Sequence, residues 1–440
     1  MRELAYDIVY GTMEQGGHSD ALFHRTLEKR RELSPPQKNY LKRLSYGTIE
    51  RCIELDAILN QFATTPVQRM EPVVRTVLRM ALYDIWYMEQ VPEAAACNEA
   101  VELVKKKGGE RYAGFVNGLL RNLLRQRDKI RPGEDWVRYS LPRPLMEQLS
   151  ARYGKKTAGK IGAAFLSRSG ETTLHIHTGR VGLEEYKERL TMAGISVRPG
   201  EYMEEALIVK GLPDVSSLPG YEEGLFFVQD ESSMLPVCCA GIRPGQRVVD
   251  VCSAPGGKAL HALMKLQGQG QVIARDVSEH KVQRIRENVS RMRFENTECR
   301  VWDARKEDKS LAGQADVVLA DVPCSGIGII GRKPEIKYRA MEQIEELVPL
   351  QRKICEASVK LLKPGGVFLY STCTISEREN EENVAWMEEN CGLKRDSLNA
   401  FLPESLRNRM TEKGMLQMLP GLQKSDGFFV ARMIRNEGNG

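Results

Sequence analysis

Two cysteines of the chain each follow an apolar run and could act as nucleophiles. Cys324 lies in ADVPCSGIG, which spans Ala320 to Gly328, and Cys373 ends YSTC, which begins at Tyr370. A cysteine thiolate attacks electron-poor carbon when its pKa is lowered. A cysteine can equally be a small side chain in a tight turn, so these stretches alone leave open which thiol does chemistry.

Acidic residues and a glycine turn follow other apolar runs in the same half of the chain. DVCSAPGGKA, residues 250–259, carries two adjacent glycines at a predicted helix start, where free backbone N–H groups can face a ligand. The following runs end at Asp276, Asp303 and Asp321. An acid after the second strand can hold ribose hydroxyls, and the next acid suits an adenine edge. We therefore predict a nucleoside site, with a plain strand-to-helix turn as the alternative.

A basic stretch, GRKPEIKYR, follows the first cysteine motif and could hold phosphates. The candidate residues are Arg332, Lys333, Lys337 and Arg339. A solvated loop is the alternative interpretation. Residues 131–170 are also basic, with eight Lys and Arg against three Asp and Glu, whereas residues 171–240 hold five against twelve. This distribution is compatible with a nucleic-acid partner.

The elements that must position these residues alternate between strand and helix across residues 233–440. The strand-like runs are RVVDVC, QVIARDVS, CRVWDA, ADVVLADV, GGVFLYSTC and FFVARMI. Repeated strand–helix units predict a parallel sheet with helices on both faces, and ligands bind outside the carboxyl ends of such strands. We expect the fourth and fifth strands to be neighbours, ~4.8 Å apart. Both thiols could then face one pocket.

Three further segments precede this core. Residues 1–128 show helical periodicity throughout and predict a compact all-α bundle. Residues 129–165 are basic and rich in proline and glycine, and we interpret them as a linker with a short helix. Residues 166–232 alternate like strands around one helix, which predicts a small α+β module. His175 and His177 would share one strand face there. Two histidines without acidic or cysteine partners are more often surface or packing residues than metal ligands.

The composition is that of an ordinary soluble protein, with 440 residues, 42% apolar and 28% charged. No apolar run approaches the ~20 residues of a membrane span, and the N-terminus lacks a signal-peptide pattern. We therefore expect a cytoplasmic protein without a membrane partner. The ten cysteines are scattered, with no Cys-x-x-Cys pair. This spacing disfavours a zinc site or a disulfide framework, and we predict no metal.

Taken together, SAPGGK, ADVPCSGIG and YSTC resemble the RNA cytosine-C5 methyltransferases that use S-adenosylmethionine. LDAIL, LRMALYDIWYM, VPEAAACNEAVELVKK and GFVNGLLRNLLR resemble the NusB-like RNA-binding domain. That domain ahead of this core is the arrangement of the Fmu/Sun (RsmB) family of 16S rRNA methyltransferases, and DGFFVARMI also resembles their ending. The likeness implies a multidomain fold, with a NusB-like bundle, a small ferredoxin- or RRM-like module and a Rossmann-like methyltransferase core.

The resemblance also implies roles for individual residues. The methionine part of the cofactor would be wrapped by Cys252, Ser253, Ala254, Pro255, Gly256, Gly257 and Lys258. Asp276 would bind the ribose and Asp303 the adenine, while Asp321 would lie near both the methyl donor and the base. Cys373 would be the nucleophile that adds to C6 of cytosine, and Cys324 would assist release of the product. The target base must leave its stack, so single-stranded or splayed RNA is implied.

Two positions depart from the family pattern. Ala259 follows Lys258 where threonine is common, and we expect a small effect on the loop. Lys281, which we count among the cofactor-binding residues, stands where an arginine is frequent. It keeps the charge but loses the fork geometry of a guanidinium.

The leading hypothesis is an enzyme that makes 5-methylcytosine at one cytosine of 16S rRNA. The nearest alternative is the same chemistry on 23S rRNA or tRNA. A second is a non-catalytic RNA-binding assembly factor, which the intact acids and both cysteines disfavour. A third is DNA cytosine methylation, in which the Pro-Cys cysteine attacks and the Thr-Cys cysteine would not be needed.

Overall fold

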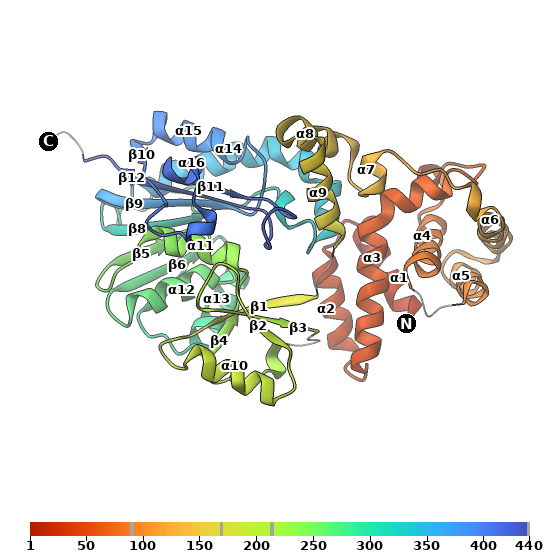
Figure 1. Cartoon of the computed structure of the whole chain (residues 1–440), viewed down its shortest axis with the longest axis horizontal. Helices are drawn as coiled ribbons and strands as arrows, with labels where there is room; N and C mark the ends of the chain where they lie inside the picture. The colour runs from red at the N-terminus through yellow and green to blue at the C-terminus, as the bar shows by residue number, and fades with distance from the viewer. Residues whose placement is uncertain (89–91, 168–169, 212–214, 438–440) are drawn as a thin grey trace. The chain divides into compact units, whose positions relative to one another are not determined.

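The computed structural model describes residues 1–88, 92–167, 170–211 and 215–437. It divides into two compact units (Figure 1). The first comprises Met1–Arg168 with Ile330–Arg339, and the second comprises Ser169–Ile329 with Ala340–Gly440. Within the described residues, no helix combines the length and the apolar composition that crossing a bilayer requires.

The first unit is built from helices, drawn from red to yellow in Figure 1. They are α1 (Arg2–Met13), α2 (Ser19–Lys29), α3 (Pro35–Leu59), α4 (Pro72–Tyr87), α5 (Glu93–Gly108), α6 (Ala113–Arg125), α7 (Asp135–Arg138), α8 (Arg143–Tyr153) and α9 (Lys155–Leu166). On α4, Val74, Val77 and Leu78 are buried in the shared core, as their helical spacing predicts. The helical prediction for the N-terminal segment is confirmed.

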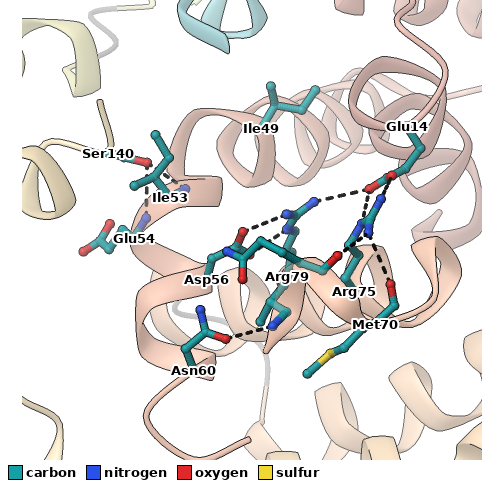
Figure 2. Close-up of polar contacts among 12 residues, drawn as sticks. Glu14, Ile49, Ile53, Glu54, Asp56, Asn60, Met70, Arg75, Arg79 and Ser140 are labelled. Carbon is teal, nitrogen blue, oxygen red and sulfur yellow. Dashed lines mark hydrogen bonds and ion pairs between the residues drawn. The ribbon is translucent and has the colours of Figure 1, made fainter. Parts of the chain in front are cut away.

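A charged network inside the first unit fixes α4 against its neighbours. Arg79 on α4 donates from Nε and Nη2 to the two carboxylate oxygens of Asp56 on α3, each at 2.7 Å (Figure 2). It also contacts Glu14, the residue after α1, at 3.4 Å, and Arg75 bonds the same carboxylate. Because Arg79 is only 8% exposed, these carboxylates compensate a charge that would otherwise be costly to bury.

Residues 129–165 are part of this helical unit, so their interpretation as a linker with a short helix is wrong. Three helices, α7 to α9, occupy the segment. Leu141 and Leu145 are fully buried. Ser140 Oγ accepts the backbone N–H of Ile53 on α3 at 3.2 Å (Figure 2). The basic side chains of this segment are exposed apart from the half-buried Arg152, whereas apolar residues such as Ala158 and Ile161 are fully buried.

The second unit contains a small antiparallel sheet of order β2-β3-β1-β4. Its strands are β1 (Glu171–Ile176), β2 (Val197–Pro199), β3 (Ala206–Lys210) and β4 (Phe226–Val228), and α10 (Leu183–Met192) packs on them. Tyr186 on α10 and Phe226 on β4 are buried in the core of this module. Strands and a helix occur where the sequence predicts them, apart from β2, which the prediction missed. A ferredoxin- or RRM-like identity for this module stays a prediction.

The larger sheet of the second unit has the order β10-β12-β9-β8-β5-β6-β7, with β11 paired to β12. Its strands are β5 (Arg247–Asp250), β6 (Gln271–Asp276), β7 (Thr297–Val301), β8 (Ala315–Asp321), β9 (Leu362–Thr372), β10 (Leu393–Arg395), β11 (Met415–Met418) and β12 (Phe428–Arg435). The strands from β9 to β7 run parallel, whereas β10, β11 and β12 pair in antiparallel fashion. The sheet is therefore mixed rather than wholly parallel as predicted.

Helices cover both faces of this sheet, as predicted. They are α11 (Glu231–Ala240), α12 (Gly257–Leu266), α13 (Glu279–Arg291), α14 (Ala340–Val359), α15 (Glu381–Asn390) and α16 (Arg409–Glu412). One core cluster joins α11, α12 and α13 to the strands, and another joins α14 and α15. Because α11 starts at Glu231 and packs into the first cluster, the predicted border between residues 232 and 233 falls inside this helix.

The strands β8 and β9 are direct neighbours, as expected. Their register pairs Ala320 with Tyr370 and Asp321 with Ser371. Since both strands run in the same direction, the segments that follow them leave the sheet at the same edge. This pairing brings the two cysteine motifs together.

Candidate active site

The glycine loop after β5 turns sharply before α12 begins at Gly257. Gly256 has a φ of 108°, a conformation that glycine adopts without steric penalty. Its N–H donates to the carbonyl oxygen of Ser253 at 2.7 Å. Ser253 N–H in turn donates to the carbonyl oxygen of Arg275 on β6 at 2.8 Å. The loop is therefore held against the neighbouring strand.

Asp276, the last residue of β6, is held between this loop and α13. Its Oδ2 accepts the N–H of Ala254 at 3.1 Å, and its Oδ1 accepts the N–H of Val277 at 2.8 Å. Lys281 Nζ lies 3.0 Å from Oδ1. The Lys281 side chain is 52% exposed, so a ligand hydroxyl could replace its ammonium group at little cost.

Asp303 follows β7 and pairs with Arg305. The guanidinium donates to both carboxylate oxygens, with Nη2 at 2.7 Å from Oδ2. This hydrogen bond lowers the pKa of Asp303. The carboxyl group is therefore ionised at neutral pH and can act as an acceptor.

Asp321 ends β8 and receives one donor on each carboxylate oxygen. Lys258 Nζ donates to Oδ2 at 2.7 Å, and Ser371 Oγ donates to Oδ1 at 2.7 Å. Lys258 is only 9% exposed, so this ion pair is well shielded from solvent. The two donors hold the carboxylate in a fixed orientation.

The thiol sulfurs of Cys324 and Cys373 lie 3.1 Å apart. A backbone hydrogen bond connects the loops that carry them, since Gly328 N–H donates to the carbonyl oxygen of Cys373 at 3.1 Å. A Cβ atom on Gly328 would lie 2.1 Å from the carbonyl oxygen of Gly427. Only glycine allows this close approach of three segments.

The two thiols are not equivalent in their surroundings. The hydrogen bond with Cys373, followed by burial, raises the pKa of the Cys324 thiol well above its ordinary value. The carboxylates of Glu379 and Asp321 act in the same direction. Cys324 therefore keeps its proton at neutral pH and can donate it to a neighbouring sulfur.

A pocket of about 390 Å³ unites most of these groups. It is lined by Val251, Cys252, Ala254, Asp276, Val277, Lys281, Trp302, Asp303, Ala304, Arg305, Asp321, Val322, Pro323, Cys324, Leu350, Ile354 and Cys373. The volume and the mixture of apolar walls with a few polar groups are typical of small-molecule sites. Acceptors at three strand ends fit a nucleoside with hydroxyl and amino donors.

Five residues of the predicted cofactor loop do not line this pocket. They are Ser253, Pro255, Gly256, Gly257 and Lys258. Lys258 still acts on the pocket, because its ammonium group binds the Asp321 carboxylate. The other four shape the turn that carries Cys252 and Ala254 to the pocket wall.

The four basic candidates for phosphate binding belong to the first unit, in the segment Ile330–Arg339. Lys337 is only 2% exposed, and its Nζ donates to the carbonyl oxygen of Glu50 on α3. The prediction that Lys337 binds RNA is therefore wrong, since a buried ammonium cannot reach a phosphate. Arg332, Lys333 and Arg339 are exposed and stay candidates.

Several pocket residues were missed by the sequence argument. Trp302 and Arg305 flank Asp303, so the neighbourhood of that acid was a usable signal. Leu350 and Ile354 lie one turn apart on α14 and have no local signal of function. Only the packing of α14 beside the sheet brings them to the pocket.

Two protein families match the two parts of this chain. Residues 1–125 match the NusB family, and residues 238–434 match the family described as 16S rRNA methyltransferase RsmB/F. A relative from Bacillus subtilis (strain 168), named probable ribosomal RNA small subunit methyltransferase B, is 34% identical, with 98% of each chain covered. The ribosomal RNA small subunit methyltransferase B of Vibrio cholerae is 30% identical over 98% of this chain and 96% of its own.

The fold of the whole chain also recurs in a solved structure. The crystal structure of PH0851 superposes with a TM-score of 0.82 and 23% identity, covering 98% of this chain and 99% of that one. The resemblance drawn from the sequence motifs is confirmed by the family matches. The chain belongs to the RsmB/F family of 16S rRNA methyltransferases and carries the NusB-family domain at its N-terminus.

Proposed function

We propose that the protein transfers a methyl group from S-adenosylmethionine to C5 of one cytosine in 16S rRNA. The observation that carries this proposal is the pair of thiols 3.1 Å apart at the pocket that Asp321 lines. Two sulfurs in contact suit a reaction in which one cysteine attacks as a thiolate and the other, still protonated, donates a hydrogen bond to the sulfur when it leaves. Family membership supports rRNA as the substrate class.

The pocket residues would hold the cofactor as follows. Asp276 would accept hydrogen bonds from the ribose hydroxyls, and Asp303 would accept one from the adenine amino group. Cys252 and Ala254 would contact the methionine part, with Lys258 fixing Asp321 beside them. When bound, S-adenosylmethionine supplies an electrophilic methyl group. Leu350 and Ile354 would exclude water from the apolar wall.

Cys373 begins the reaction in this proposal. Its thiolate forms a bond to C6 of the cytosine, and the electron pair of the C5–C6 double bond makes C5 nucleophilic. Asp321 would hydrogen-bond the edge of the ring and keep it oriented while C5 accepts the methyl group. A base then removes the C5 proton, the double bond re-forms, and Cys373 leaves as a thiolate.

Cys324 completes the cycle. Because its pKa is raised, it holds a proton at neutral pH and can donate a hydrogen bond to the departing sulfur. A hydrogen-bonded thiolate is a better leaving group, so Cys324 speeds the loss of Cys373 from C6. In this proposal Cys373 is therefore the attacking residue and Cys324 the hydrogen-bond donor.

We further propose that the helical first unit binds the rRNA near the target. The likeness to the NusB family supports this role. The exposed Arg332, Lys333 and Arg339 would contact phosphates, and the target cytosine would be unstacked before it enters the pocket.

The test is methyl transfer with labelled S-adenosylmethionine to 16S rRNA from a strain that lacks the modification. Wild type is compared with Cys373→Ala and Cys324→Ala, and Cys299→Ala, on β7 at the far edge of the parallel strands, is the control. Cys373→Ala should abolish transfer. Cys324→Ala should accumulate a protein–RNA adduct that resists denaturant. Cys299→Ala should match wild type.

Parallel reactions with 23S rRNA, tRNA and single-stranded DNA test the substrate class. Transfer by Cys373→Ala, or an adduct that forms only with that variant, would overturn the assignment of the thiols. Transfer to DNA but not to RNA would overturn the substrate. Mapping the labelled base as anything but 5-methylcytosine would overturn the reaction.

A further inference from the structure

Glu379, between β9 and α15, is a fully buried carboxylate that bonds to Ser325, the residue after Cys324. It accepts hydrogen bonds from neutral donors. Its Oε1 receives Ser325 N–H at 2.8 Å and Gln351 Nε2 at 3.0 Å, and its Oε2 receives the Ser325 hydroxyl. A buried polar group is tolerated only when hydrogen bonds of this kind replace its lost hydration.

These donors fix the residues on both sides of Cys324. Ser325 follows it in the chain, and its backbone and hydroxyl both point to Glu379. Gln351 uses the same amide nitrogen to bind the carbonyl oxygen of Pro323, the residue before the cysteine, at 2.9 Å. Glu379 thus holds the residue after Cys324 directly and the residue before it through Gln351.

The same chain of hydrogen bonds reaches the second cysteine. Ser325 Oγ lies 2.8 Å from Oγ1 of Thr374, the residue after Cys373. Since Ser325 gives its hydroxyl hydrogen to Glu379, the Thr374 hydroxyl must be the donor in this pair. The Glu379 carboxylate therefore orients a relay that ends beside Cys373.

A second layer keeps the carboxylate in place. Tyr370 OH donates to the backbone carbonyl oxygen of Glu379 at 2.6 Å. Asn383 Nδ2 donates to Oε1 of Gln351 at 2.7 Å, which directs the Gln351 amide toward Glu379. All of these side chains are 1% exposed or less, so the network has little freedom to relax.

We propose that Glu379 is a positioning residue that holds the thiols of Cys324 and Cys373 side by side for the covalent step. This inference rests on the cysteine mechanism proposed above. Both carboxylate oxygens of Glu379 act as acceptors, which is what the two Ser325 donors and the Gln351 amide require. A displacement of about 1 Å at a reacting group can lower a rate by about 100-fold.

The central experiment compares Glu379→Gln with Glu377→Gln in the full-length protein. Glu377 is exposed and lies two residues upstream, so its variant makes the same chemical change outside the network. In Glu379→Gln an amide NH₂ replaces one acceptor and faces a donor. We expect kcat to fall about 10- to 100-fold, while the Kd for S-adenosylmethionine changes less than about twofold, because cofactor-binding Asp276 and Asp303 are untouched. Glu377→Gln should match wild type in both.

A second pair of variants keeps the proposal testable if Glu379→Gln does not fold. Thr374→Val removes the link from Ser325 to the Cys373 loop together with a longer hydrogen bond from Ser376 N–H at 3.3 Å. Ser325→Ala removes the hydroxyl between the two loops. Each should lower kcat with cofactor binding retained, and each should lower the yield of denaturant-resistant adduct when it is combined with Cys324→Ala. The double variant Thr374→Val/Ser325→Ala should be no slower than Ser325→Ala alone, because both changes break one relay.

The outcomes separate this inference from the proposed function. If Cys373→Ala abolishes transfer but Glu379→Gln keeps wild-type kcat, the positioning role is wrong and the cysteine mechanism stands. Wild-type kcat in Thr374→Val and Ser325→Ala would overturn it in the same way. If Cys373→Ala still transfers methyl groups, the proposed function itself fails, whatever the Glu379 variants do.

Discussion

Lys258 Nζ lies 2.7 Å from Oδ2 of Asp321, which links the start of α12 to the end of β8. The two residues belong to motifs 63 positions apart in the chain. The pair joins the loop that would carry the cofactor to the carboxylate that would orient the base. A cofactor that orders the glycine loop would therefore also order Asp321.

Replacement of Asp321 by asparagine tests this link. The amide keeps the shape but removes the charge, so Lys258 loses its anionic partner in a shielded position. We expect kcat for methyl transfer to fall about 10- to 150-fold, the equivalent of one charge-assisted hydrogen bond. Asp316→Asn, at the opposite end of β8, is the matched control. Its partner Lys363 is 48% exposed, and a rate for Asp321→Asn equal to that of the control would rule out the link.

Substitution of Lys337 should affect the stability of the protein, whereas substitution of Lys333 should affect RNA binding. Lys337→Ala removes a buried donor to the Glu50 carbonyl oxygen. We expect it to lower the free energy of unfolding by about 2 kcal/mol, measured by urea denaturation. Lys333 is exposed, so Lys333→Ala should leave stability unchanged. It should weaken RNA binding and reduce the salt dependence of binding by about one phosphate contact. Weaker RNA binding by Lys337→Ala with unchanged stability would show that Lys337 contacts RNA after all.

Two buried histidines make the second unit sensitive to acid. His175 on β1 and His261 on α12 are fully buried with ring centroids 4.4 Å apart. Burial lowers the pKa of His175 to about 4, and it lowers the pKa of His261 well below the ordinary value. Of the surface and packing roles that the sequence left open for His175, the structure shows the packing one. Both rings are neutral in the folded protein, whereas the unfolded chain binds protons below a pKa of about 6.5.

The sign of the pH effect follows from these pKa values. The unfolded state binds more protons than the folded state as pH falls from about 6.5 toward about 4, so stability is present above that window and is lost within it. Each histidine contributes up to about 1.4 kcal/mol per pH unit. His175→Gln should remove one such contribution from the slope of unfolding free energy against pH. The exposed His24→Gln should not, and equal slopes for the two variants would contradict the assignment.

The strand ends show how far the sequence leads. Asp276, Asp303 and Asp321 stand at the carboxyl ends of parallel strands, as their place after apolar runs predicts. Alternation of apolar residues and the turn glycines are local properties, because backbone sterics and burial act on neighbours in the chain. The β8–β9 pairing was also predictable, since a repeated strand–helix unit limits the possible orders.

Other features of the fold and of the pocket depend on tertiary packing and could not be predicted from the sequence. The burial of Lys337 depends on α3, almost 300 positions away in the chain. The packing of residues 129–165 into the helical unit depends on apolar faces that their proline, glycine and basic content concealed. Leu350 and Ile354 enter the pocket only because α14 packs on the sheet.

Glu379 is the clearest example of a residue whose role could not be predicted from the sequence. As a sequence it is one acid in SEREN, next to other acids of the same type. The sequence by itself determined which residues could react, because that is fixed by side-chain chemistry and by local strand and turn patterns. Only the fold decided which carboxylate is buried, which donors it meets and how close the two thiols lie. Those properties arise from contacts between segments that chain order does not specify.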